Sequence, residues 1–168
     1  MELPYVIVIG GPNGAGKSTL AKHLLLPNTD ITAFVNADVI AATLTDTTDD
    51  QRNIVAGRRA LELMDNLVER RASFAIESTL SGKTLAARLR SWRALGYRIV
   101  MHYVLVDDSS ILERRIAHRV TQGGHNIPVP DQRRRLGRSI RNFYELYRGL
   151  SDECTIHDGR DDAADDII

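Results

Sequence analysis

The chain has 168 residues, of which 43% are hydrophobic and 26% are charged, and its formal net charge is zero. These values are typical of an ordinary globular protein that is long enough to bury a core. No apolar run approaches the roughly 20 residues of a membrane span, and the single cysteine, Cys154, excludes an internal disulfide. No basic segment precedes an apolar one at the N-terminus, so we expect no cleaved signal. We therefore expect residues 1–168 to form one cytoplasmic domain.

The basic residues are nearly all arginines, since only Lys17, Lys22 and Lys83 are lysines. The arginines crowd residues 88–148, whereas residues 158–168 are acidic. A nucleic-acid surface is one interpretation of this bias. The aromatic content of 5%, with no interleaved aromatic platform, does not favour a nucleic-acid partner. Arginines that clamp the phosphates of a small substrate explain the bias at least as well.

Apolar runs and helical spacing predict alternating strands and helices. The predicted strands cover residues 5–11, 31–38, 73–78, 97–108 and a short segment around 154–158. The predicted helices cover residues 17–26, 47–71, 82–96, 109–120 and 131–150. Pro27 and Gly96 are typical helix-ending residues, and Thr47 or Thr48 is a candidate helix cap. Because strands and helices alternate, we expect an α/β fold with a parallel sheet and helices on both faces.

Residues 10–19 read GGPNGAGKST and contain the complete P-loop pattern after an apolar strand. Glycines allow backbone N–H groups to converge on phosphates, and the following helix points its positive end at the same anion. Lys17 can then bridge the β- and γ-phosphates of ATP, while the Ser18 hydroxyl binds Mg²⁺. A glycine-rich turn without a ligand is the alternative. The candidate nucleotide-binding residues are Gly11, Pro12, Asn13, Gly14, Ala15, Gly16, Lys17, Ser18 and Thr19.

Two carboxylates end predicted strands on the side where ligands of parallel sheets gather. Asp38 ends the second strand and is a candidate base for the proton of a substrate hydroxyl. Glu77 ends the third strand and is placed to hold Mg²⁺ through water or to bind substrate. For each carboxylate, a helix N-cap is the alternative role.

Residues 115–142 are a candidate lid, because two arginine-bearing helices flank a Gly-Gly turn. Arg119 lies one helical turn after Arg115, and Arg134 and Arg138 are related in the same way. A lid that swings arginines over the phosphates would supply positive charge and expel water. A solvated basic helix face is the alternative. His125, in the turn, is a candidate substrate-binding residue, with a structural role as its alternative.

A P-loop is also typical of ATPases, including the nucleotide domains of ABC transporters. LSGK and YVLVDD resemble two further motifs of that family, but neither is complete. Lys83 and Thr84 stand where the first motif needs a glycine and a glutamine, and Ser109 follows Asp108 where the second needs a glutamate. A P-loop ATPase and a nucleotide-gated binding module without a small-molecule acceptor therefore remain as alternatives to a kinase.

Two further side chains are expected in the core. Cys154 on the last strand is predicted to be buried, with no catalytic role. Trp92 lies on the predicted helix after the third strand, residues 82–96, and is expected in the core or on a packing surface.

The chain resembles the zeta-toxin-like P-loop kinases in GPNGAGKST, NAD, SFAIESTLSG and RVTQGGHNIP with the arginine run that follows. The resemblance implies a P-loop NTPase fold with a five-stranded sheet in the order 2-3-1-4-5, and ATP-dependent phosphorylation of a hydroxyl. In characterised toxins of this kind the acceptor is UDP-N-acetylglucosamine. By motif, Lys17 and Ser18 would handle ATP and Mg²⁺, Asp38 would be the general base, and Glu77 would bind the acceptor. Arg119 and one of residues 133–135, with Arg134 as the first choice, would clamp phosphate. An antitoxin partner does not follow from the sequence.

Overall fold

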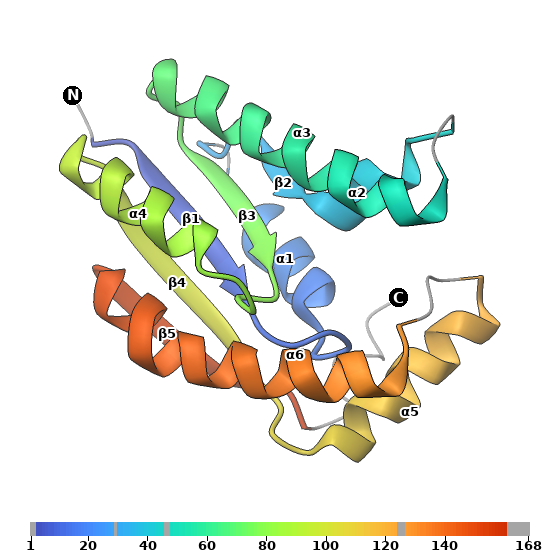
Figure 1. Cartoon of the computed structure of the whole chain (residues 1–168). Coiled ribbons are helices and arrows are strands. Elements are labelled where there is room, and N and C mark those ends of the chain that lie inside the picture. The colour runs from blue at the N-terminus through green and yellow to red at the C-terminus, as the bar shows by residue number, and fades with distance from the viewer. Residues whose placement is uncertain (1–2, 29, 46–47, 124–126, 161–168) are drawn as a thin grey trace.

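The computed structural model describes residues 3–28, 30–45, 48–123 and 127–160 (Figure 1). Five strands form one all-parallel sheet in the order β2-β3-β1-β4-β5, which confirms the predicted order. The strands are β1 (Tyr5–Gly10), β2 (Phe34–Asn36), β3 (Phe74–Ser78), β4 (Arg98–Leu105) and β5 (Glu153–Asp158). The order reverses beside β1, so the loop after this strand lies at the point where α/β sheets bind ligands.

Helices connect the strands. They are α1 (Lys17–Leu25), α2 (Ala37–Ala42), α3 (Asp49–Glu69), α4 (Thr84–Ala94), α5 (Ser109–Thr121) and α6 (Val129–Asn142). A π-helical turn, Phe143–Tyr147, and a 3₁₀ turn, Arg148–Leu150, continue α6. The prediction of residues 131–150 as one helix therefore merged three helical segments. None of the described helices is long and apolar enough to cross a membrane.

The two faces of the sheet bury different side chains. In β1, Val6 and Val8 pack into the core under α3, α4 and the turn after α6, whereas Ile7 and Ile9 pack towards α1. All four side chains are at most 6% exposed. A strand buried on both faces is a continuous apolar run, which is why VIVI was recognisable in the sequence. Figure 1 shows α1 behind the sheet and α3, α4 and α6 in front of it.

The core confirms the expectation for Trp92 and contradicts that for Cys154. Trp92 is 3% exposed, and its ring meets that of Phe74 edge-on at 5.5 Å. Cys154 is exposed, so its predicted burial is wrong. The reason is its place on β5, an edge strand that pairs with β4 alone. Residues 153–156 are all exposed, whereas the central strands are covered on both sides.

Candidate active site

The phosphate loop lies between β1 and α1, and three of its glycines, Gly16 among them, have positive φ angles. Gly11 and Gly14 have φ angles of 148° and 80°, a region that side chains rarely adopt. A Cβ atom at Gly11 would lie 2.6 Å from the carbonyl oxygen of Val104. The loop is thus held close to the end of β4, with its following helix beginning at Lys17. This is the arrangement expected of an anion cradle at a helix N-terminus.

Lys17 lies at the centre of the candidate site. Its side chain is 7% exposed, and its Nζ donates to the carbonyl oxygen of Pro12 at 2.9 Å. Burial lowers the pKa of Lys17, while the charges of Glu77 and Asp38 raise it and that of Arg119 lowers it further. Side chains from β3, α2 and α5 therefore act electrostatically on one ammonium group. Asp38 and Arg119 therefore lie within electrostatic range of Lys17.

Glu77, at the end of β3, contacts the phosphate loop. The Ser18 hydroxyl donates to the two carboxylate oxygens of Glu77 at 3.0 and 3.1 Å. The parallel register places Glu77 beside Ile9 of β1 on one side and Asn36 of β2 on the other. Its carboxylate accepts from the side chains of Ser18 and Asn36, whereas an N-cap accepts from backbone N–H groups of a helix, so these contacts differ from the alternative role of a helix cap.

Asn36 is a site residue that the sequence analysis missed. It is 7% exposed, and its Nδ2 donates to Glu77 Oε2 at 2.9 Å. Its Oδ1 accepts from the backbone N–H groups of Asp38 and Val39 at 2.8 and 3.4 Å. Asn36 therefore caps α2 and orients Glu77 at the same time. The available signal was a polar residue at the end of a buried strand.

The position of Asp38 differs from the prediction. Strand β2 ends at Asn36, and Asp38 lies exposed in the first turn of α2. The strand ends early because Asn36 takes the capping position and starts the helix. Asn36, and not Asp38, is therefore the N-cap. The charge of Asp38 still raises the pKa of Lys17, so Asp38 lies within electrostatic range of the phosphate loop.

The candidate lid has the predicted helices, and its C-terminal end is fixed. Ser139 Oγ lies 2.9 Å from the Tyr103 hydroxyl, and Asn142 Nδ2 donates to the carbonyl oxygen of Leu80 at 2.9 Å. The rings of Tyr103 and Phe143 are stacked, with 3.9 Å between their centroids. Because these contacts are buried in the main core, residues 139–142 belong to the body of the molecule and not to a movable segment.

The arginines of the lid helices differ in their exposure and in the ion pairs that they form. Two of them are exposed and form ion pairs, Arg133 with Glu113 and Arg134 with Asp131, both at 2.8 Å. Arg135 is half-buried, and helical spacing places it on the side of α6 that carries Ser139 and Asn142. Arg138 and Arg119 are exposed. His125, the predicted substrate-binding residue of the turn, lies outside the described residues.

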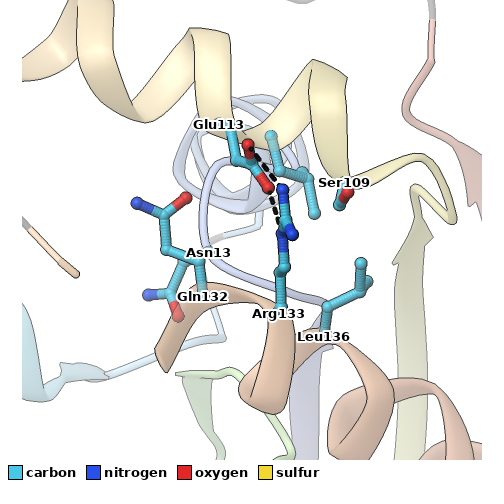
Figure 2. A pocket seen from close by; sticks show the side chains of 7 residues that line it. Asn13, Ser109, Glu113, Gln132, Arg133 and Leu136 are labelled. Atoms are coloured by element: carbon cyan, nitrogen blue, oxygen red, sulfur yellow. Dashed lines mark hydrogen bonds and ion pairs between the residues drawn. The ribbon is translucent and has the colours of Figure 1, made fainter. Parts of the chain in front are cut away.

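A narrow crevice lies where α5 and α6 meet the phosphate loop (Figure 2). Asn13 of the loop and Gln132 of α6 lie side by side on one wall, and Arg133 points across to Glu113. The oxygens Asn13 Oδ1 and Gln132 Oε1 are buried with no hydrogen-bond partner in the described part of the chain. Residues of α6 and of the phosphate loop line this crevice together, so the two segments pack directly on each other. A movement of α6 would therefore change the surroundings of the loop.

The segment after β5 also contacts the loop, which the sequence analysis did not anticipate. A Cβ atom at Gly159 would lie 2.9 Å from the carbonyl oxygen of Ala15. Arg115 of α5 donates to the carbonyl oxygen of Gly159 at 2.7 Å. Arg115 therefore holds the lid helix against the end of the sheet, a different task from that of Arg119. The glycine in HDGR was the signal for this close approach.

A cavity of about 280 Å³ lies over the ends of β2 and β3, between α3 and the start of α4. Glu77 and Ser78 line it from β3, Leu61 and Met64 from α3, and Leu85 from α4. One residue, Glu77, therefore contacts both the phosphate loop and this cavity. The candidate site consists of the phosphate loop and a neighbouring cavity, and both contact the carboxylate of Glu77.

Comparison with known proteins identifies related chains. A family model described as an AAA domain matches residues 6–145. An uncharacterised protein of Haemophilus influenzae is 32% identical over 118 residues, which make up 70% of this chain and 81% of that protein.

Solved structures with the same fold include kinases. A candidate kinase of Chloroflexus aurantiacus has a TM-score of 0.69 at 16% identity, over 94% of this chain and 89% of that one. A chain of the PezAT toxin–antitoxin system of Streptococcus pneumoniae has a TM-score of 0.67 at 17% identity, over 95% of this chain and 69% of that one. Shikimate kinase of Acinetobacter baumannii has a TM-score of 0.58 at 19% identity, over 98% of this chain and 90% of that one. The predicted P-loop kinase fold is confirmed, and the resemblance to toxin-type kinases holds at the level of the fold.

Proposed function

The chain belongs to the AAA domain family, and from this premise we propose that it is an ATP-dependent kinase that phosphorylates a hydroxyl of a small molecule. The observation that carries the proposal is the position of Glu77. Its carboxylate contacts Ser18 of the phosphate loop and lines the 280 Å³ cavity. A hydrolase needs only a water beside the γ-phosphate, whereas a kinase needs a separate acceptor space there.

The phosphate loop would bind the triphosphate of ATP. Its backbone N–H groups and the N-terminus of α1 offer positive ends of dipoles to the phosphates. Lys17 now donates to the carbonyl oxygen of Pro12, and its ammonium would turn from this oxygen to the β- and γ-phosphates. Because the ammonium is already desolvated, its charge acts strongly on a phosphate that enters the loop.

The oxygen ligands beside the loop fit Mg²⁺. Ser18 Oγ and the carboxylate of Glu77 lie within 3.1 Å of each other, and hard cations prefer such oxygens. No cluster of three or more His, Cys, Asp or Glu in the described ranges could hold a metal by itself, which suits an ion held jointly with ATP phosphates. Bound there, Mg²⁺ would offset the negative charge of the transferred phosphoryl group.

Asp38 is the proposed general base. The acceptor oxygen attacks the γ-phosphorus, and a bond forms between these two atoms as the bond from the γ-phosphorus to the β,γ-bridging oxygen breaks. The hydroxyl proton passes to the Asp38 carboxylate, and ADP leaves. The exposure of Asp38 on α2 and its electrostatic reach to Lys17 support this role. Asn36 acts as a positioning residue, because it holds the backbone of Asp38 and the side chain of Glu77.

The lid arginines would stabilise the transferred phosphoryl group. Among these arginines, the role is best supported for Arg119, because its charge lowers the pKa of Lys17. From α6 we propose Arg135, which is half-buried on the inner face, ahead of the exposed Arg134 that pairs with Asp131. The movable part of the lid would end before Ser139, whose contact with Tyr103 fixes the rest of α6.

UDP-N-acetylglucosamine is the first acceptor to assay, since the resemblance to toxin-type kinases implies it. A cytoplasmic location, where ATP is available, accompanies this proposal. The test is incubation of the protein with γ-labelled ATP, Mg²⁺ and either UDP-N-acetylglucosamine or a metabolite extract, followed by mass spectrometry. A kinase yields a small molecule that has gained one phosphate. Hydrolysis without any phosphorylated product supports a P-loop ATPase instead, and ATP binding without turnover supports a nucleotide-gated binding module.

A further inference from the structure

The walls of the cavity beside Glu77 are largely apolar. Seven of the side chains that line it are aliphatic, among them Val35, Ala60, Leu61, Met64 and Ile76. They come from β2, α2, α3, β3 and α4, and all of them belong to the main core or pack against it. A ligand in this space would therefore exchange water for hydrocarbon over most of its surface.

The polar groups of the lining are few and mostly engaged within the protein. The Tyr147 hydroxyl donates to the carbonyl oxygen of Gly82 at 2.6 Å, and Ser78 Oγ accepts from the backbone N–H of Leu80 at 3.2 Å. Glu77 accepts from Ser18 and Asn36. Thr84, at the start of α4, is the fourth polar side chain on the wall. Such a lining offers few hydrogen bonds to the body of a ligand.

The charge of the lining is negative. Glu77 is its one ionisable carboxylate, and no lysine, arginine or histidine is among the described residues that line the cavity. An anionic ligand would lose its hydration and meet a carboxylate without a cationic partner on the wall. Burial of an unpaired charge is costly, so the cavity discriminates against anions.

We infer that the acceptor of this kinase is a small, electrically neutral alcohol with a largely apolar body, and not a nucleotide sugar or another anion. The inference rests on the proposed function for the transfer itself, but the choice of ligand is a property of the cavity. The volume of about 280 Å³ lies at the lower limit of ligand pockets, roughly 300 Å³. The hydroxyl of such an acceptor would lie at the Glu77 end, next to the phosphate loop, with its apolar body between α3 and β3.

Two nearly isosteric alcohols test this inference. The full chain is titrated with 4-methylbenzyl alcohol and with 4-(hydroxymethyl)benzoate, and binding is followed by ligand-observed NMR and by calorimetry. We expect the neutral alcohol to bind at least about tenfold more tightly than the carboxylate, because the second would bury an unpaired charge. Equal or tighter binding of the carboxylate overturns the inference. Failure of the neutral alcohol to bind, or tight binding of UDP-N-acetylglucosamine, overturns it as well.

A cation placed on the wall provides a second test. Leu61 is half-buried and lines the cavity from α3, so Leu61→Lys adds an ammonium with little disturbance to the core. We expect Leu61→Lys to reduce the preference for the neutral alcohol at least about tenfold, while Leu61→Met, a control of similar size, keeps it. Circular dichroism establishes that both variants are folded. An unchanged preference in folded Leu61→Lys contradicts the assignment of this cavity as the acceptor site.

The two proposals fail in different ways. If the neutral alcohol binds as expected but no acceptor gains phosphate from ATP, the kinase proposal is wrong and the ligand preference of the cavity stands. If an anionic metabolite is phosphorylated efficiently, the kinase proposal stands and the neutral-acceptor inference is wrong. Binding and transfer are measured on the same protein, so the outcomes are distinguishable.

Discussion

Ser18 donates its hydroxyl to Glu77 at 3.0 Å, although 59 residues separate them in the chain. The contact exists because β3 lies next to β1, which brings the ends of both strands to the same edge of the sheet. It joins α1, the helix proposed to receive the phosphates, to β3, which lines the cavity. The position of Glu77 therefore depends on the strand order. The proposed placement of ATP next to the acceptor depends on the strand order as well.

The orientation of Glu77 depends on Asn36, and Asn36→Asp separates its two tasks. Aspartate keeps the oxygen that caps α2, but it cannot donate to Glu77 and places a second carboxylate beside it. We expect the free energy of unfolding to fall by about 1–3 kcal/mol and phosphoryl transfer to fall at least about tenfold. Urea unfolding and the transfer assay measure the two effects. Asn53→Asp, an exposed change of equal charge on α3, is the control, and equal effects of both variants would contradict the positioning role.

Replacement of Lys17 by alanine should weaken nucleotide binding without destabilising the protein. A hydrogen bond to a charged group is worth about 1.5–3 kcal/mol, so we expect ATP to bind about 10- to 100-fold more weakly. Because burial lowers the pKa of Lys17 and so disfavours its ammonium, we expect the ligand-free variant to melt no earlier than the native protein. Calorimetry and thermal unfolding measure both quantities. Lys22→Ala, an exposed change on α1, should leave both unchanged.

Replacement of Asp38 by asparagine should remove the proposed base and keep the nucleotide site. Loss of a general base typically costs about 10²–10⁴ in rate, and we expect kcat to fall by this factor while the Kd of ATP changes less than about threefold. Asp30→Asn, an exposed change in the connection before β2, is the control. Retained turnover in Asp38→Asn would falsify the assignment of the base.

The sequence contained enough information for the phosphate loop and the strand order, for physical reasons. The loop is a local structure whose glycines are required by the chain geometry at Gly11 and Gly14. The buried strands are apolar runs, because the sheet is covered on both faces. The contact of Glu77 with the loop followed from the order 2-3-1-4-5, once the resemblance to P-loop kinases had implied that order.

The errors concern residues whose surroundings come from distant parts of the chain. Cys154 is a residue type that is often buried, but β5 lies at the edge of the sheet. The position of a strand in the sheet depends on the tertiary arrangement. The capping role of Asn36 moved the end of β2 away from Asp38. The cavity is formed by residues of β2, α3, β3 and α4 together, so no local pattern predicts its lining. For the same reason, the fixed contact of Ser139 with Tyr103 was not visible in the periodicity of α6.

A pair of histidines predicts a loss of stability in mild acid. Nδ1 of His102 on β4 lies 3.0 Å from Nε2 of His157 on β5. Burial lowers the pKa of both, and the charge of His157 lowers that of His102 further. The folded state therefore binds these protons less readily than the unfolded chain, so the stabilisation is present above about pH 6.5 and is lost as the pH falls towards the folded-state values. We expect the urea midpoint to decrease between pH 7 and pH 5, and to decrease less in His157→Gln; an identical decrease in both proteins would contradict this role.

The lid arginines make the final prediction, because Arg134 and Arg135 are neighbours with different surroundings. Arg134 is exposed and pairs with Asp131 one turn earlier, and pairs of this kind contribute little, so Arg134→Ala should leave kcat within about twofold. Arg135 is half-buried on the inner side of α6, so Arg135→Ala should lower kcat by about 10²–10³, as should Arg119→Ala.

Steady-state kinetics of the three alanine variants, with the Kd of ATP measured separately, provide the comparison. A group that meets the phosphoryl group mainly in the transition state affects kcat more than nucleotide binding, so the Kd of ATP should change much less than kcat in Arg119→Ala and Arg135→Ala. A large loss in Arg134→Ala with normal turnover in Arg135→Ala would mean that α6 rotates when the lid closes. That result would preserve an arginine clamp but reverse the assignment of the two neighbours, since a rotation about the helix axis would bring Arg134 to the side where Arg135 now lies.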